Sequence, residues 1–179
     1  MIREIVLDTE TTGLSHAEGD RLVEIGCVEL INHIPSGRNY HVYINPQRSM
    51  PEEAFRVHGL SEEFLSDKPL FKDKAAEFRN FIDDAKLIIH NAPFDMGFLN
   101  AELGWVGLPA LSNEVIDTVM LARKKHPGAP GFSKERSRTY WPTRFMLGAV
   151  PGSGAAAPRF SSAIFGPSIY SGWNDVAGG

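Results

Sequence analysis

The pattern of apolar and polar residues predicts an α/β fold over roughly the first 130 residues of the chain. Four segments have the apolar runs or the alternation typical of strands: residues 2–7, 21–31, 39–44 and 86–89. Five segments have the signals of helices: residues 51–57, 61–65, 71–84, 93–103 and 118–125. The sequence Pro35-Ser36-Gly37 predicts a hairpin turn between the second and third strands. Three antiparallel strands followed by alternating strands and helices indicate a mixed sheet with flanking helices.

Several side chains receive structural roles from the same pattern. A stripe at helical spacing predicts the buried face of the longest helix: Phe71, Ala75, Phe78 and Ile82. Cys27 lies in an apolar strand and is expected to be a small core residue. Glu24 and Glu29 are expected to be solvated strand residues, and Asp117 is expected to cap the helix at 118–125.

The pattern changes after residue 130. Residues 131–179 contain eight Gly, four Pro, seven Ser and six Ala, and no helical period survives beyond a turn or two. Such a segment has too little apolar periodicity to guarantee a packed element. The sequence therefore predicts one domain at residues 1–130, followed by a linker or interaction tail at 131–179.

Charge and composition narrow the functional classes. Residues 1–130 hold 13 basic and 20 acidic side chains, a balance that argues against broad, charge-driven binding to duplex DNA. The sequence contains no run of about 18 apolar residues, so no membrane span is expected. The first residues lack the pattern of a signal peptide, and a single cysteine fits a reducing compartment. We therefore expect a cytoplasmic protein.

The first candidate site lies where an apolar run ends in two carboxylates. Ile5-Val6-Leu7 leads directly into Asp8-Thr9-Glu10. On a strand, residues two apart project to the same face, so Asp8 and Glu10 are expected to lie together. Two close carboxylates repel each other unless a cation neutralises them, and their oxygens suit Mg²⁺ and Mn²⁺. The alternative is a strand end with two solvated acids.

A third carboxylate follows a second apolar strand. Leu87-Ile88-Ile89 leads into His90-Asn91-Ala92-Pro93-Phe94-Asp95. Pro93 suits the first turn of a helix, which places Asp95 just inside that helix. The junction of a strand and a helix is where open α/β sheets build their sites.

These segments carry a resemblance to a known family. Residues 8–13 and 90–95 resemble the first two motifs of the DEDD superfamily of 3′–5′ exonucleases, and residues 55–61 resemble a substrate-side segment between them. The resemblance is closest to the epsilon, or proofreading, subunits of bacterial DNA polymerase III, and it covers about residues 2–130. It implies a ribonuclease-H-like fold and the release of nucleoside monophosphates from DNA 3′ ends with two divalent cations, Mg²⁺ or Mn²⁺.

The resemblance also implies roles for individual residues. Asp8, Glu10 and Asp95 match the family's metal ligands. Glu53 and His58 match positions that contact the terminal nucleotide, and Thr9 and Thr11 are expected to donate hydrogen bonds to it. The alternative for His58 is an ordinary loop histidine packed beside Phe55. DNA 3′ ends and the catalytic subunit of DNA polymerase III follow as partners from the resemblance alone.

One family motif is missing. The proofreading branch takes its general base and a fourth carboxylate from a late helix with His, four residues, then Asp, and no histidine lies beyond residue 126 here. The one pair with this spacing, His90 and Asp95, belongs to the second motif. Codons can be chosen for residues 157–161 and 166–171 so that reading them one nucleotide later gives fragments that resemble the late helix. This suggests that the tail is translated in a shifted reading frame. The alternatives are a gene truncated by rearrangement or a divergent terminus.

Because this motif is absent, we expect little or no exonuclease activity from the chain as it stands. Two other functions stay open. The chain could be a catalytically silent module that binds a polymerase or a 3′ end, or an RNA-trimming exonuclease of the same superfamily. The segment from residue 41 to 69 resembles the epsilon subunits more closely than RNA-trimming relatives, which favours DNA.

Overall fold

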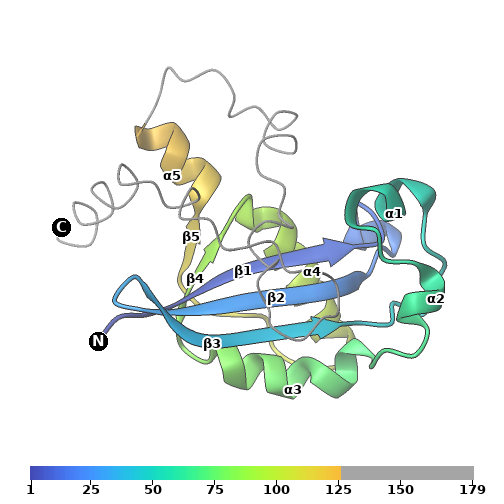
Figure 1. Cartoon of the computed structure of the whole chain (residues 1–179), viewed down its shortest axis with the longest axis horizontal. Helices are drawn as coiled ribbons and strands as arrows, with labels where there is room; N and C mark the ends of the chain where they lie inside the picture. Colours follow the sequence, from blue (N-terminus) through green and yellow to red (C-terminus); the bar gives the residue numbers. More distant parts are fainter. Residues whose placement is uncertain (126–179) are drawn as a thin grey trace. The chain divides into compact units, whose positions relative to one another are not determined.

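The computed structural model of the chain describes residues 1–125, which form a five-stranded mixed sheet. Its strands are β1 (Arg3–Thr11), β2 (Leu22–Ile31), β3 (Ile34–Tyr43), β4 (Lys86–Ile89) and β5 (Val115–Asp117), in the order β3-β2-β1-β4-β5 (Figure 1). β1, β2 and β3 are antiparallel neighbours, while β4 runs parallel to both β1 and β5. The predicted mixed sheet of three antiparallel strands plus parallel strands is confirmed.

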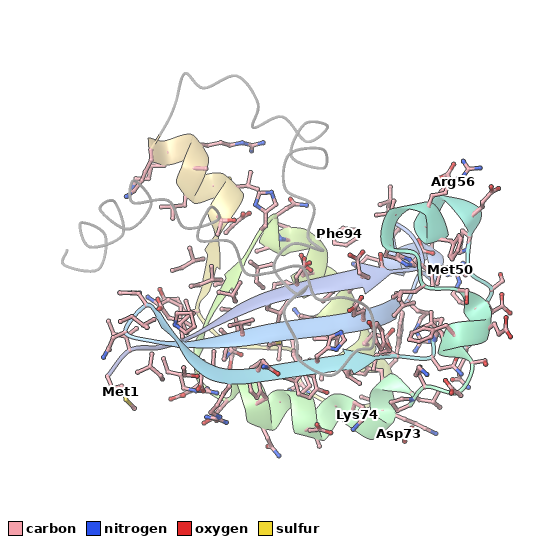
Figure 2. The ribbon with its side chains drawn as sticks, viewed as in Figure 1. Met1, Met50, Arg56, Asp73, Lys74 and Phe94 are labelled. Carbon is pink, nitrogen blue, oxygen red and sulfur yellow. The ribbon has the colours of Figure 1, made fainter. Side chains whose placement is uncertain are left out.

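In the described residues, five helices follow the predicted segments to within a few residues, and the short helix η1 was not predicted. The helices are η1 (His16–Glu18), α1 (Glu52–His58), α2 (Glu62–Leu65), α3 (Phe71–Ile82), α4 (Ala92–Trp105) and α5 (Thr118–Lys125). The short helices α1 and α2 lie beside the end of the sheet where β1 ends (Figure 1). Asp73 and Lys74 project from α3 away from the sheet (Figure 2). None of the helices in the described part of the chain is long and apolar enough to cross a membrane.

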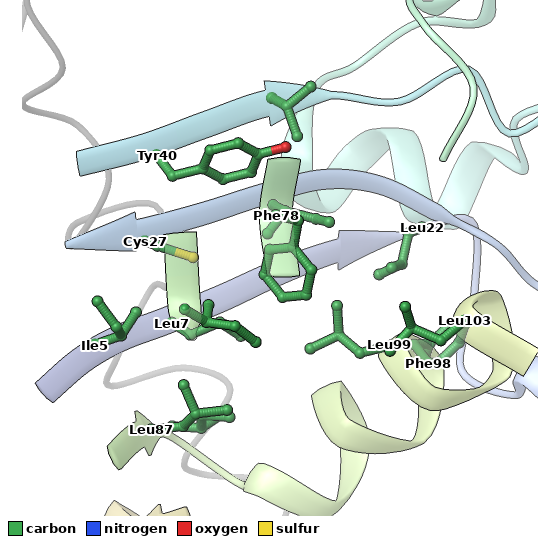
Figure 3. Packing of buried hydrophobic residues seen from close by; sticks show 14 of the residues in the cluster. Ile5, Leu7, Leu22, Cys27, Tyr40, Phe78, Leu87, Phe98, Leu99 and Leu103 are labelled. Carbon is green, nitrogen blue, oxygen red and sulfur yellow. The ribbon is translucent and has the colours of Figure 1, made fainter. Parts of the chain in front are cut away.

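The core lies between one face of the sheet and the helices α3 and α4. Phe78 on α3 and Leu99 on α4 point towards Leu7 on β1 and Cys27 on β2 (Figure 3), and all four are buried. The predicted buried face of α3 is confirmed, since its buried residues are Phe71, Ala75, Phe78 and Ile82. This packing on the core face of the sheet holds β1, the strand that carries Asp8, in place.

The hairpin between β2 and β3 is confirmed, but its predicted turn is wrong. The turn is made by Asn32 and His33, whose φ values are 50° and 67°. Two consecutive residues in the left-handed region give the turn that matches the twist of antiparallel strands. Pro35 instead pairs with Leu30 inside the sheet, next to a register shift, so Pro35-Ser36-Gly37 belongs to the start of β3.

Besides β3, the strands β1 and β5 differ from the expectation. β1 continues to Thr11 because its pairing with β2 extends to Thr11↔Leu22, so the acidic motif lies on the strand and not after it. β5 was not expected, because three residues are too few to show a period. It pairs with β4 and brings Asp117 to the end of the sheet near the start of α4.

The prediction that Glu24 and Glu29 are solvated is wrong. The side chain of Glu29 is only 2% exposed and accepts hydrogen bonds from Ser36, Arg3 and Arg38 at 2.7–2.9 Å. Ser36, followed by the two arginines, holds the pKa of Glu29 below its usual range despite the opposing effect of burial. Glu24 is mostly buried and pairs with His41 at 2.6 Å.

Candidate active site

Asp8 and Glu10 lie together on one face of β1. Both belong to the antiparallel pairing with β2, in which Asp8 is opposite Gly26 and Glu10 is opposite Glu24. Alternate residues of a strand share a face, so the i and i+2 spacing brings the two carboxylates to one side of the sheet. This is the arrangement that the Asp-x-Glu sequence predicted.

Asp95 reaches this region from the first turn of α4. A hydrogen bond of 2.7 Å runs from the hydroxyl of Thr9 to Oδ1 of Asp95, between side chains that are both buried. Pro93 lies in the first turn of α4, as predicted. The parallel pairing of β4 with β1 therefore places the start of α4 beside residues 8–10, although 86 positions separate Thr9 from Asp95.

Asp8 and Asp95 are buried carboxylates whose surroundings favour a nearby positive charge. Asp8 is 6% exposed and Asp95 is 3% exposed, and Oδ2 of Asp8 is buried without a hydrogen-bond partner. Burial, followed by the charges of Asp95 and Glu10, raises the pKa of Asp8 well above its usual range. Burial also raises the pKa of Asp95 to about 7, although the hydrogen bond from Thr9 opposes this. An unpartnered buried carboxylate oxygen beside other carboxylates is chemically suited to a hard divalent cation.

A complete set of ligands is nevertheless not in place. Within residues 1–125, no group of three or more His, Cys, Asp or Glu side chains is arranged so that it could hold a metal ion. Asp8, Glu10 and Asp95 thus fit part of a metal site, and their role as ligands stays a prediction. The segment in which the fourth carboxylate was sought, 131–179, lies outside the described residues, as does the proposed frame shift.

The four predicted substrate residues have different surroundings. The hydroxyl of Thr9 is used by Asp95, and the hydroxyl of Thr11 donates to the carbonyl of Gly13 at 2.6 Å. Glu53 is exposed on α1. His58 is the last residue of α1, is 5% exposed, and accepts a hydrogen bond from the backbone N–H of Leu60 through Nδ1. His58 is thus a helix residue and not a loop residue, and contact of these four with a nucleotide stays a prediction.

Asp117 has a second role that the sequence analysis missed. Its Oδ1 accepts from the backbone N–H of Val119 at 2.8 Å, so the predicted cap of α5 is confirmed. The same oxygen accepts from the backbone N–H of Asn91 at 3.1 Å. Asn91 has a left-handed backbone, with φ 61° and ψ 49°, and directly precedes α4. Asp117 therefore holds the turn from which α4, and with it Asp95, begins. No sequence signal pointed to this second role, because β5 was not expected.

The turn at Asn91 allows a test of this geometry. We expect Asn91→Ala to lower the free energy of unfolding by about 1 kcal/mol, because alanine is strained in the left-handed region. Asn91→Gly should leave it nearly unchanged, since glycine adopts this backbone freely and keeps the N–H bonded to Asp117. Urea unfolding of both variants measures the difference. Equal destabilisation by the two changes would mean that the Asn91 side chain, and not its backbone, stabilises the turn.

Two similar proteins from different bacteria have the same name. DNA polymerase III subunit epsilon of Rickettsia felis is 56% identical over 133 residues, which cover 72% of this chain and 58% of that protein. The protein of the same name from Salmonella typhimurium is 48% identical over 134 residues, which cover 70% and 55%. The chain therefore spans just over half the length of these curated relatives.

Solved structures share the fold. Exonuclease X in complex with 5′ overhanging duplex DNA is 26% identical, with a TM-score of 0.57 over 76% of this chain and 71% of that one. A structure of exonuclease I superimposes with a TM-score of 0.67 over 76% of this chain and 34% of that one, at 16% identity, and so shows the fold alone. The sequence model of the RNase_T family, described as "Exonuclease", matches residues 5–145. Together with the carboxylates on β1 and α4, this match establishes that the chain belongs to the RNase_T exonuclease family.

Proposed function

We propose that this chain is a metal-dependent 3′–5′ exonuclease module that acts on DNA 3′ ends during proofreading of replication. The buried Asp8 carboxylate carries this proposal, because its unpartnered Oδ2 and its neighbours Asp95 and Glu10 favour a cation. Membership of the exonuclease family supports the reaction class. Relatives named DNA polymerase III subunit epsilon support DNA as the substrate and proofreading as the setting.

The chemistry divides between the bound ions and the chain. Two divalent cations, Mg²⁺ or Mn²⁺, would activate the attacking water and stabilise the leaving 3′ oxygen. Asp8, Glu10 and Asp95 would hold these ions. Thr9 keeps Asp95 in one orientation through its 2.7 Å hydrogen bond. Burial of Asp8 and Asp95 strengthens their attraction for a cation, because little water competes there.

This chain is least equipped to remove the proton from the attacking water. A positioned general base contributes about 10²–10⁴-fold to the rate of such a reaction. The sequence after residue 126 contains no histidine, and its acids are Glu135 and Asp175. We therefore infer slow turnover by the chain alone. The same observation favours the second candidate, a silent module that retains a 3′ end without cutting it.

Partners and location follow from the same relatives. The name of the relatives places them in a DNA polymerase III assembly, so we propose that the polymerase's catalytic subunit is a partner of this chain. Replication takes place in the bacterial cytoplasm, which is the location we propose here. The substrate and the partner are proposed independently, so an experiment can contradict one and leave the other standing.

The first experiment is digestion of a 5′-labelled single-stranded DNA under single-turnover conditions, with Mn²⁺ or with EDTA. We expect slow, stepwise shortening from the 3′ end in Mn²⁺, none in EDTA, and none with Asp8→Asn. Titration of Mn²⁺ should show at least about tenfold weaker binding by this variant. Shortening that survives EDTA, or a chain that binds no Mn²⁺, would contradict the proposal. Binding of Mn²⁺ and of the 3′ end without shortening would identify the silent module.

A further inference from the structure

A second acid–base pair lies on the same face of the sheet as Asp8 and Glu10. Glu24 on β2 is directly opposite Glu10, and His41 on β3 is directly opposite Gly26, which in turn is opposite Asp8. Directly opposite residues of antiparallel strands project to the same face. On this face, Asp8, Gly26 and His41 lie in one row across the three strands, and Gly26 contributes no side chain. Glu10 and Glu24 lie in the next row.

Three carboxylates on this face are costly in the absence of a cation. Like charges directly opposite each other destabilise a sheet, and Glu10 and Glu24 form such a pair. The same face carries Asp8, whose buried Oδ2 has no hydrogen-bond partner. That unpartnered oxygen is an independent sign that this face receives a cation.

His41 holds Glu24 in a fixed orientation. Nε2 of His41 lies 2.6 Å from Oε1 of Glu24, and both side chains are largely buried, at 19% and 14% exposed. The ring of Tyr43 packs edge-on against His41 at 4.7 Å, and Phe64 of α2 packs edge-on against Tyr43 at 5.0 Å. The aromatic contacts thus hold the His41 ring, and the ring restricts the carboxylate of Glu24 through one short hydrogen bond.

We propose that Glu24 and His41 form a positioning pair for the metal site, in which Glu24 adds a fixed negative charge beside Glu10 and His41 orients it. The pair acts on the cations through Glu10 and through charge, without ligating them. Groups that hydrogen-bond to metal ligands tune the affinity of a site by roughly ten- to a hundredfold, and we expect a charge directly opposite Glu10 to act at the lower end of this range. This inference rests on the proposed metal-dependent exonuclease function.

The chain contains its own matched control. Glu4 and His33 form a second Glu–His pair, 2.8 Å apart, at the opposite end of β1 and β2. Removing the charge of Glu4 changes the net charge of the protein as much as removing that of Glu24. Any effect confined to the Glu24–His41 pair must therefore come from its position and not from net charge.

The test is a titration of the full chain with Mn²⁺, followed by the electron paramagnetic resonance signal of free Mn²⁺. We expect Glu24→Gln to weaken Mn²⁺ binding about tenfold and Glu4→Gln to leave it unchanged. His41→Leu should weaken binding several-fold. His41→Gln should restore most of it, because an amide can still donate to Glu24. His33→Leu should have no effect. Thermal unfolding in EDTA reports the stability of each variant separately.

The outcomes separate this inference from the proposed function. If the unaltered chain binds no Mn²⁺, both are overturned. If Asp8→Asn abolishes binding while Glu24→Gln binds as tightly as the unaltered chain, the positioning pair alone is overturned. Equal weakening by Glu24→Gln and Glu4→Gln would also overturn it, since that would be an effect of net charge. Weakening by Glu24→Gln and His41→Leu, with recovery in His41→Gln, supports it.

Discussion

Supplying the missing His-x4-Asp helix is expected to raise the rate of 3′-end digestion by about 10²–10⁴-fold, the contribution of a positioned general base. The change replaces residues 131–179 with the remainder of the Rickettsia felis relative, in which the family resemblance places that helix. Asp8, Glu10 and Asp95 are unchanged, so a difference in rate comes from the added segment, which carries the base and the fourth carboxylate. Single-turnover digestion of 5′-labelled DNA in Mn²⁺, at equal concentrations of chimera and parent, measures the ratio of rates.

Two controls make this expectation specific. The same chimera with alanine in place of the motif histidine should fall back towards the parent rate, and the chimera with Asp8→Asn should not digest DNA. A parent chain as fast as the chimera would show that residues 126–179 already provide a base, and would refute the inference of slow turnover. A chimera that binds Mn²⁺ tightly but stays slow would place the defect outside proton removal.

The candidate carboxylates could be located from the sequence because their signal is local. Asp8 and Glu10 are two residues apart at the end of an apolar run, and Asp95 lies five residues after His90 at a strand–helix junction. Period and turn chemistry are properties of neighbouring residues, so one sequence is sufficient to locate them. The same holds for the buried face of α3, which the spacing of its apolar residues predicted correctly.

The errors have a common cause in contacts between distant residues. Glu29 was assigned to solvent because acids on strands are commonly exposed, but Arg3 reaches it from β1 and Arg38 from β3. Glu24 was misassigned for the same reason, since its partner His41 is 17 positions away. The hairpin turn was misplaced because Pro-Ser-Gly is a strong local signal, whereas cross-strand register placed the turn at Asn32-His33.

The second large effect is expected in stability. Asp95→Asn should make the metal-free chain more stable than the parent at pH 8, by on the order of 2–4 kcal/mol. The folded chain raises the pKa of Asp95 to about 7, from an ordinary value of 3.8. A group whose pKa is raised by folding stabilises the fold below its ordinary pKa, and this contribution is lost as the pH rises through about 7. Asparagine has a similar shape but no charge, so it avoids this loss.

Unfolding by urea in EDTA, at several pH values between 4 and 8, tests the sign of this effect. The two proteins should have similar stability near pH 4, and the advantage of Asp95→Asn should grow as the pH rises. Asp84→Asn, which removes an exposed carboxylate next to the end of α3, controls for net charge and should behave like the parent. A parent as stable as Asp95→Asn at pH 8 would mean that the buried carboxylates carry no electrostatic strain.

Added Mn²⁺ should close the gap between the two proteins at pH 8. A cation that binds the folded parent neutralises the repulsion among Asp8, Glu10 and Asp95, and it stabilises the fold by mass action. Asp95→Asn has lost one of these carboxylates, so it should gain less from the same concentration of Mn²⁺. The carboxylates that weaken the metal-free fold would then be the ones that bind the ion, as expected where a protein retains strain for function. A gap that persists unchanged in saturating Mn²⁺ would separate the strain at Asp95 from metal binding.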